Sequence, residues 1–509
     1  VKGNIVGGSY VASGAITFDD AALVSQASFD SGDTVELTTT TGNIELVGVK
    51  ANDGATLTSA AAIDGATVIA NNNDVTLEAA HIASSTVTAE NGAASLTARD
   101  GGTIVNTVVG ATGDVTFTAG DLDNLTVSAG GDIRGGILGG GGALIADTGN
   151  VTGNIVGGEY IASGAITFEQ AATIASASFD SGDVVTLKTL TGNIELVGVK
   201  ANDGASLTAA AGIDGSTVIA NNGGVTMTAP QIADSTITTQ SGDVTFEGGD
   251  LYNLTVTSAG LINGSDVKGN IVGGSYVGTD NITFENAALI SKASFDGSAD
   301  VILGASGNIE LVQVKANDGA TLTSAAAIDG ATVIANNNDV TLEAAHIASS
   351  TVTAENGAAS LTARDGGTIV NTVVGATGDV TFEGGDLYNL TVTSAGAIDG
   401  TKVTGNIVGG SYIGTDDITF DDASLISQAS FDGSADVILG ASGNIELVQV
   451  KANDNATLTS DAGIDGATVI ANHGDVTMTA AQIADSTVTA QSGDVTFEGG
   501  DLYNLTVTS

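Results

Sequence analysis

The chain has 509 residues and a formal net charge of −47, from 59 acidic side chains against 12 Lys and Arg; this excludes nucleic-acid binding through phosphate neutralisation and predicts attraction for divalent cations. Gly occurs 72 times, Pro once and Cys never, and aromatic residues are 4% against 42% hydrophobic. These numbers exclude a disulfide framework, a core of large aromatic side chains and a disordered acidic tail.

The largest repeat is marked by one phrase. VKGNIVGGSY at Val1 recurs as VTGNIVGGEY at Val151, VKGNIVGGSY at Val267 and VTGNIVGGSY at Val403. The chain therefore divides into four blocks, 1–150, 151–266, 267–402 and 403–509. Residues 49–117 and 314–382 are identical, so internal duplication is evident. We expect one continuous stack of repeats without a separate globular domain.

A finer period of 19 to 21 residues runs through each block. In the first block, a first apolar station is occupied by Phe18, Leu37, Leu57, Leu77, Leu96 and Phe117. A second station is occupied by Val24, Ile44, Ile63, Ile82, Ile104 and Leu122. A third station, five residues later, is occupied by Phe29, Val49, Val68, Val87, Val109 and Val127. Two residues beyond the third station comes a small residue, Ser31, Ala51, Ala70, Ala89, Ala111 or Ala129.

This pattern predicts an all-β fold, a parallel β-solenoid with coils of about 20 residues. A single coil cannot bury its own apolar face, whereas coils stacked at about 4.8 Å pair strand on strand. The odd spacing between the second and third stations requires a bend, and we expect a right-handed coil with three faces. We expect about 25 coils and no helix longer than a turn or two. At the block junctions, as in Ile262-x4-Val267, the pattern predicts a shortened or reshaped coil.

The block lengths agree with stacking. Block three has 136 residues and block two has 116, so they differ by the length of one coil. The chain ends at DLYNLTVTS, which inside blocks two and three is followed by AGLINGSD and AGAIDGTK. We therefore expect the segment to continue into further coils, or to stack head to tail with other copies.

The phrases GDVTF, NDVTLEAAHI and GNIELVGV resemble the shafts of large bacterial exoproteins of the filamentous-haemagglutinin type. The resemblance covers nearly the whole chain at the level of pattern. It implies a right-handed β-helix, export to the cell surface and an adhesive role. Together with the acidity, it implies secretion by a bacterium in a saline environment. The sequence has no apolar run of about 18 residues, so we expect no membrane insertion in this segment.

Candidate metal ligands are few. FDSGD and FDGSAD place two Asp around Gly at a predicted corner, which makes Ca²⁺ ligands possible at Asp30, Asp33, Asp296 and Asp300. Asp and Gly are also simply good turn formers. His81, His346 and His473 lack a second His at a metal-binding spacing, so we expect them to be structural. Otherwise we expect no cofactor.

Other recurring residues are expected to form ladders, in which equivalent side chains of successive coils stack on one another. We expect the twelve Phe and seven Tyr to occupy ladder or core positions, and Asn52, Asn71 and Asn91 to stack at one corner. Lys50, Lys200, Lys315 and Lys451 recur in VKAND, and we expect Lys50 to point outward beside Asp53. The Asn-x-Thr motifs at Asn124, Asn253, Asn389 and Asn504 also fit ladders, with glycosylation as an alternative.

A catalyst needs unlike groups converging on one place, whereas here everything is duplicated. The sequence therefore predicts no enzyme and no catalytic residues, but a structural segment of a long extracellular or cell-surface fibre or adhesin. Its partners would be further repeats or copies of itself, end to end and in part side by side. The alternative is a carbohydrate-binding or carbohydrate-active β-helix; Arg99, Arg134 and Arg364 are too scattered for its groove. An ice-binding face is disfavoured because Glu36, Ser95 and Ala98 interrupt the Thr pattern.

Overall fold

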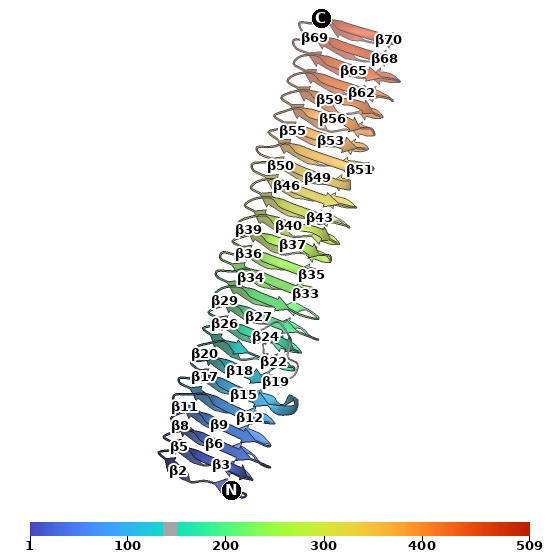
Figure 1. Ribbon diagram of the computed structural model, residues 1–509. Coiled ribbons are helices and arrows are strands. Elements are labelled where there is room, and N and C mark those ends of the chain that lie inside the picture. Colours follow the sequence, from blue (N-terminus) through green and yellow to red (C-terminus); the bar gives the residue numbers. More distant parts are fainter. Residues whose placement is uncertain (136–149) are drawn as a thin grey trace, which may run out of the picture. The chain divides into compact units, whose positions relative to one another are not determined.

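The computed structural model describes residues 1–135 and 150–509 and confirms the predicted fold class, an all-β parallel β-solenoid. It has about 26 coils of about 19 residues each. Within the described residues there is no α-helix, and the one 3-10 turn, η1, spans Arg99–Gly101. The last part of the first block, residues 136–149, lies outside the described residues. The chain forms two compact units, Val1–Gly260 and Leu261–Ser509, and each is a stack of coils (Figure 1).

One coil consists of three short strands joined by corners. In the first unit, β6 (Val35–Thr39), β7 (Ile44–Glu45) and β8 (Gly48–Ala51) form one coil. The next coil repeats them as β9 (Ala55–Ser59), β10 (Ala62–Asp64) and β11 (Thr67–Ala70). Each strand pairs in parallel with its counterpart one coil away.

The register confirms the three predicted stations residue by residue. Leu37 pairs with Leu57, Ile44 with Ile63 and Val49 with Val68. The small residues also stack, as in the pairing of Ala51 with Ala70. Apart from half-buried Phe18, side chains at the stations of the first block are 0–2% exposed, and burial of each Val, Leu or Ile stabilises the fold by about 1.5–3 kcal/mol. The core is therefore a continuous column of aliphatic ladders within each unit.

The strands that carry the third station form what we call the narrow sheet, in which nearly every strand has four residues. In the first unit its strands are β2 (Ser9–Ala12), β5 (Ser28–Ser31), β8, β11, β14 (Thr86–Ala89), β17 (Val108–Ala111), β20 (Thr126–Ala129), β23 (Glu159–Ala162), β26 (Ser178–Ser181), β29 (Gly198–Ala201), β32 (Thr217–Ala220), β34 (Thr236–Thr239) and β36 (Thr255–Ser258).

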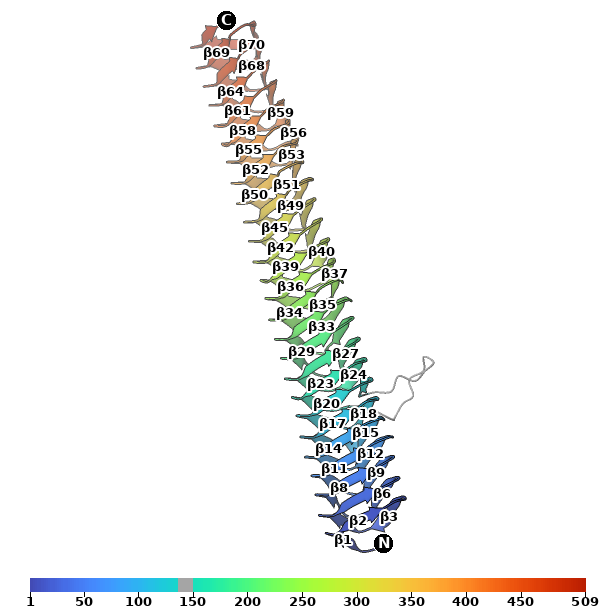
Figure 2. The same cartoon turned by 90° about the vertical axis from the view of Figure 1, so that its left-hand side faces the viewer.

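In the second unit the narrow-sheet strands are β39 (Ser275–Gly278), β42 (Ser294–Gly297), β45 (Gln313–Ala316), β48 (Thr332–Ala335), β50 (Thr351–Ala354), β52 (Val373–Ala376), β55 (Thr391–Ser394), β58 (Ser411–Gly414), β61 (Ser430–Gly433), β64 (Gln449–Ala452), β67 (Thr468–Ala471), β69 (Thr487–Ala490) and β71 (Thr506–Thr508). In each unit these strands lie along one side of the stack (Figure 2).

The first and second stations belong to a second sheet, which we call the wide sheet. In most coils two strands share it, as β6 and β7 do, but some coils join them into one. Examples are β33 (Val225–Ala233) and β35 (Val244–Tyr252) in the first unit, and β49 (Val340–Ala348) and β51 (Ala359–Val370) in the second. The wide sheet is therefore less uniform than the narrow sheet.

The predicted bend between the second and third stations has a clear cause. Two residues before every described narrow-sheet strand, the backbone is left-handed, with φ between +46° and +70°. Gly, Asn, Asp and Ser occupy many of these corners, since they adopt this conformation most easily. Leu46 and its counterparts Leu196, Leu311 and Leu447 also do so, and these side chains are 58–66% exposed. One left-handed residue per coil thus fixes the spacing of five.

The wide sheet contains one β-bulge near the start of each block. In β59 (Ile418–Ala423), Phe420 pairs with Leu439 and Ala423 with Ala441, so Asp421 and Asp422 both oppose Gly440 of β62 (Val437–Ala441). The same register shift occurs in β3 (Ile16–Ala21), β24 (Ile166–Ala171) and β40 (Ile282–Ala287). Such bulges bend a strand and turn side chains outward.

The reshaped coil expected at block junctions is present within the second unit. Strand β56 (Ile398–Val403) pairs Ile398 with Val380, but its register then shifts so that Lys402 lies opposite Glu383. A Cβ at Gly400 would lie 2.0 Å from the Phe420 ring. Glycine at the junction therefore makes room for the aromatic side chain of the next coil.

Each block begins with an aromatic cluster in the core. Tyr276 stacks on Phe295, with ring centroids 5.1 Å apart, and meets Phe284 edge to face at 5.3 Å. Tyr10, Tyr160 and Tyr412 make the same two contacts. The expected core role is confirmed for Tyr160, Tyr276 and Tyr412, while Tyr10 is half-buried in the first coil. On the wide sheet, Tyr252 and Tyr388 are half-buried and Tyr503 is 50% exposed.

Candidate functional site

The four candidate Ca²⁺ ligands lie on exposed or half-buried positions near the narrow sheet. Asp296 lies 3.6 Å from the Lys315 ammonium group, and the Asp300 carboxylate accepts a hydrogen bond of 2.8 Å from the Gly319 amide. Asp30 pairs in register with Lys50, and the Asp33 amide donates to the Ser31 hydroxyl. Across residues 1–135 and 150–509, no three His, Asp or Glu side chains are grouped to hold a metal ion. The Ca²⁺ assignment stays a prediction, and these contacts give it no support.

The VKAND lysines pair with acidic residues on the neighbouring coil. Lys200 lies 3.0 Å from Asp180 and Lys451 3.1 Å from Asp432, each on the preceding coil. Lys50 is exposed, as predicted, and its register partner on the preceding coil is Asp30; its proximity to Asp53 stays a prediction. Parallel stacking in register places each outward side chain beside its counterpart one coil away, at about 4.8 Å. The ion pair therefore forms along the stack.

The histidines make ladder contacts. Nδ1 of His81 lies 3.2 Å from Thr103 Oγ1, and His346 repeats this contact with Thr368. Nδ1 of His473 lies 3.0 Å from Asn453 Oδ1. All three rings are held by a polar group on a neighbouring coil, which agrees with the structural role that the sequence predicts.

The arginines do not converge either. Arg364 forms a 2.9 Å ion pair with Glu343 and donates to the Ser324 carbonyl, and Arg99 makes the equivalent contacts with Glu78 and Ser59. Arg134 pairs with Asp114 and Asp132. Each guanidinium thus joins neighbouring coils at the surface, where such pairs contribute about 0–1 kcal/mol.

Asparagines form ladders at two corners. Asn72 donates to the Asn52 carbonyl at 2.9 Å and Asn91 to the Asn71 carbonyl at 2.7 Å. Asn71 and Asn91 therefore make the predicted contact, whereas Asn52 contacts Asn72. The bonds run mainly from side chain to backbone carbonyl. At the left-handed corner, Asn124 of an Asn-x-Thr motif donates to Asn106 at 2.9 Å, and Asn504 donates to Asp485 at 3.0 Å. Asn124 and Asn504 therefore suit these positions for two reasons: they adopt the left-handed backbone conformation, and their side chains bond to the equivalent residue one coil away.

In the last block, the turns before the first-station strands carry an Asp/Asn ladder that we did not anticipate. In the second unit, Asp417, Asp436, Asn455 and Asp475 each accept a hydrogen bond from the backbone amide of the next coil, at 2.8–2.9 Å. The carboxylates therefore cap amides that the parallel ladder leaves unpaired. The signal in the sequence is the recurrence of Asp or Asn just before the first station.

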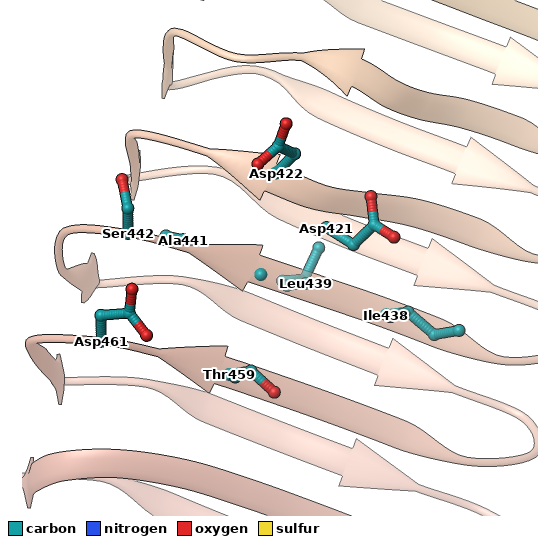
Figure 3. A pocket seen from close by; sticks show the side chains of 9 residues that line it. Asp421, Asp422, Ile438, Leu439, Ala441, Ser442, Thr459 and Asp461 are labelled. Atoms are coloured by element: carbon teal, nitrogen blue, oxygen red, sulfur yellow. The ribbon is translucent and has the colours of Figure 1, made fainter.

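One hollow in the last block gathers three carboxylates. Its lining includes Asp421, Asp422, Ser442 and Asp461 on three successive coils. Figure 3 shows Asp421 and Asp422 on one strand and Asp461 beyond the neighbouring strand. The bulge turns the first two outward, and Asp461 stands where earlier blocks have Ala60, Ala210 and Ala325. No Lys, Arg or His is among the residues that line this hollow.

The clearest electrostatic perturbations belong to the aromatic clusters. Burial raises the pKa of Tyr160, Tyr276 and Tyr412 well above the ordinary value of 10.0, and the charge of Asp123 adds to the effect at Tyr160. The hydroxyl groups of Tyr160 and Tyr412 are buried without a hydrogen-bond partner. These side chains are fully buried and a substrate cannot reach them. Their raised pKa values are therefore a consequence of core packing and do not indicate a catalytic site.

No family model matches the chain, and no curated protein matches it. The structure shows the β-solenoid fold that the resemblance to filamentous-haemagglutinin shafts implies. Among the described residues, no helix is long and apolar enough to cross a membrane.

Proposed function

We propose that this chain is a structural segment of a long extracellular or cell-surface fibre or adhesin. The observation that carries this proposal is the recurrence of four distinctive features in every block. Aromatic cluster, bulge, left-handed leucine and outward lysine each occur once in every block. A repeated surface suits mechanical or multivalent roles, whereas catalysis needs one place where unlike groups converge.

The surface chemistry supports an exported, saline setting. A net charge of −47 keeps separate chains apart at low ionic strength, and salt of about 0.15 M shortens the reach of each charge to about 8 Å. The chain has no Cys to depend on a redox environment. We propose that it is secreted to a bacterial cell surface, is not an enzyme, and binds divalent cations diffusely along its acidic faces.

The proposal is tested by electron microscopy and sedimentation of the purified chain over a salt series. Elongated assemblies that grow as salt or divalent cation is added would support a fibre segment. Dispersed monomers under every condition would contradict it.

A second candidate is a carbohydrate-binding or carbohydrate-active β-helix. The hollow around Asp421, Asp422 and Asp461 favours it, because Asp461 makes that site unlike its counterparts in the other blocks. Glycan-array binding by the chain and by its Asp461→Ala variant tests this candidate. Specific binding that the variant loses would favour it over the fibre segment.

A further inference from the structure

The outward side chains of the narrow sheet form a nearly neutral face on a strongly acidic chain. Two residues per strand point outward, and over both units these include five acids and four lysines: Asp30, Glu159, Asp180, Asp296, Asp432, Lys50, Lys200, Lys315 and Lys451. Their net charge is −1, against −47 for the whole chain. Most of the other outward residues are Thr, Ser, Val, Ile and Gly.

The charges on this face are ordered as well as balanced. In the last block, one outward column reads Ile413, Asp432, Lys451 and Ile470 on four successive coils. Asp432 and Lys451 form a 3.1 Å ion pair at its centre. The column beginning at Val277 has the same order, with Asp296 next to Lys315.

We propose that this face of each unit is a docking surface for a second copy of the chain, packed face to face with its stacking axis reversed. The proposal rests on the fibre function proposed above and names the surface for side-by-side assembly. Two such faces are complementary in charge, because reversing the stacking axis of one copy exchanges the order Asp–Lys for Lys–Asp.

Consider a two-fold axis parallel to the strands and passing through the coil of Gly375. Asp296 then faces Lys451 of the other copy, and Lys315 faces its Asp432. Ile334 faces Ile413, and Val373 beside the axis faces itself. A symmetric contact of this kind pairs residue i with j and j with i, so all four charge pairs of the unit are satisfied at once.

The parallel arrangement fails the same test. With the axes of the two copies parallel and their coils level, Asp296 would face Asp296 and Lys315 would face Lys315. Like charges in contact across an interface weaken it strongly. The order of charges thus selects the reversed arrangement.

The centre of the face is also open to close approach. A Cβ added at Gly375 would meet no atom within 4 Å, and the same is true of Gly110, its counterpart in the first unit. The exposed fractions of the neighbouring Val373 and Val108 are 45% and 46%. In the first unit the column from Val11 to Ile219 has the same order, with Gly110 at its centre.

The size of the face suits a stable contact. Thirteen coils per unit at about 4.8 Å, with strands of four residues at about 3.3 Å each, give roughly 800 Å² per copy. That area equals the contribution of one partner to a standard protein interface. At about 0.15 M salt the carboxylates on the other faces are screened beyond about 8 Å, while charges across this face are in contact.

Site-specific cross-linking tests the geometry, since the chain has no native cysteine. We would compare Gly375→Cys with Ser442→Cys, an exposed turn residue outside the narrow sheet, using a thiol cross-linker that spans about 10 Å, the distance between packed sheets. We expect Gly375→Cys to give covalent dimers and Ser442→Cys to remain largely monomeric. Equal cross-linking of the two variants would overturn the proposal.

Charge reversal tests the mechanism. Lys50→Glu, Lys200→Glu, Lys315→Glu and Lys451→Glu combined should weaken side-by-side association by at least about tenfold, since each cross-pair becomes a like-charge contact. The matched control, Lys188→Glu, Lys268→Glu, Lys292→Glu and Lys402→Glu, changes net charge equally at exposed positions outside the face and should associate like the parent. A variant with all four Asp–Lys pairs exchanged should recover association with itself.

The outcomes separate this inference from the fibre function. If elongated assemblies form but Gly375→Cys does not cross-link preferentially, the docking surface is wrong and the fibre function stands. If the face instead adsorbs to another material while the chain stays monomeric in solution, the self-docking proposal is overturned. Dispersed monomers under all conditions contradict both.

Discussion

The outer faces of the narrow and wide sheets differ in charge and in regularity. The narrow sheet keeps one strand length through nearly every coil, and its outward side chains have a net charge of −1. The wide sheet has bulges, strands of two to twelve residues and an Asp/Asn ladder beside it. A charge of −46 therefore falls outside the narrow face. Most of the acidity is therefore separated from a regular surface on which acids and lysines nearly balance.

The largest effect on the free energy of unfolding is expected from a charge placed on the inward side of the narrow sheet rather than on its outward side. Val87 of β14 is fully buried, while its neighbour Thr88 points outward. Val87→Asp places an unpaired carboxylate in an aliphatic ladder and should lower the free energy of unfolding by several kcal/mol. Thr88→Asp should change it by less than about 0.5 kcal/mol. Urea unfolding of both variants provides the measurement, and equal stability would mean that the inward face is assigned wrongly.

The second prediction compares glycines on the two sheets. A Cβ at Gly440, opposite the wide-sheet bulge, would lie 2.4 Å from the Asp421 carbonyl oxygen, whereas Gly375 has open space. Gly440→Ala should therefore destabilise by about 1–3 kcal/mol through overpacking. Gly375→Ala should be neutral or stabilise by a few tenths of a kcal/mol, because it restricts the unfolded chain. Thermal unfolding monitored by circular dichroism distinguishes them, and the reverse order would refute the bulge geometry.

The third prediction uses the tyrosines of the narrow sheet. Burial raises the pKa of Tyr160, Tyr276 and Tyr412, so these phenols stay neutral in the folded state while the unfolded chain releases their protons above about pH 10. Stability should be unaffected below pH 10 and should fall as the pH rises further. The combined Tyr→Phe variant should lose this alkaline dependence. At pH 7, Tyr160→Phe and Tyr412→Phe should each be as stable as the parent or more stable by up to about 1 kcal/mol, because their hydroxyl groups are buried without a hydrogen-bond partner. An unchanged alkaline transition would show that other groups cause it.

The smallest effect is expected from removing a whole coil. Ala354 and Ala376 occupy the same register position on adjacent narrow-sheet strands. Deletion of residues 355–376 therefore joins Ala354 to Thr377 in register, and the melting temperature should shift by only a few degrees, since each repeat contacts its neighbours alone. Deletion of residues 355–365 breaks the register and should abolish cooperative unfolding. If both deletions behave alike, coil stacking does not govern stability.

The sequence predicted the repeated parts of the fold more completely than the exceptions. The three stations are confirmed at every pairing in the first block because one apolar residue at a fixed spacing suffices to define a buried ladder. The bulge at Asp421 and Asp422 was missed. The spacing between the first and second stations varies from coil to coil, so one extra residue there leaves no periodic signal. The ion pair of Lys451 with Asp432 was not anticipated, because it joins residues 19 apart in the chain that lie side by side only in the stack. Handedness, block boundaries and Ca²⁺ binding stay predictions.

The most direct test of the fibre proposal is sedimentation velocity of the purified chain, paired with electron microscopy, at about 10 mM salt with chelator and at about 0.5 M salt. Repulsion between chains with a charge of −47 should hold them apart in the first condition and should be screened in the second. We predict elongated assemblies at high salt that dissociate or swell on dilution into chelator. A single species of 49.6 kDa in both conditions, with no filament visible, would contradict the proposal.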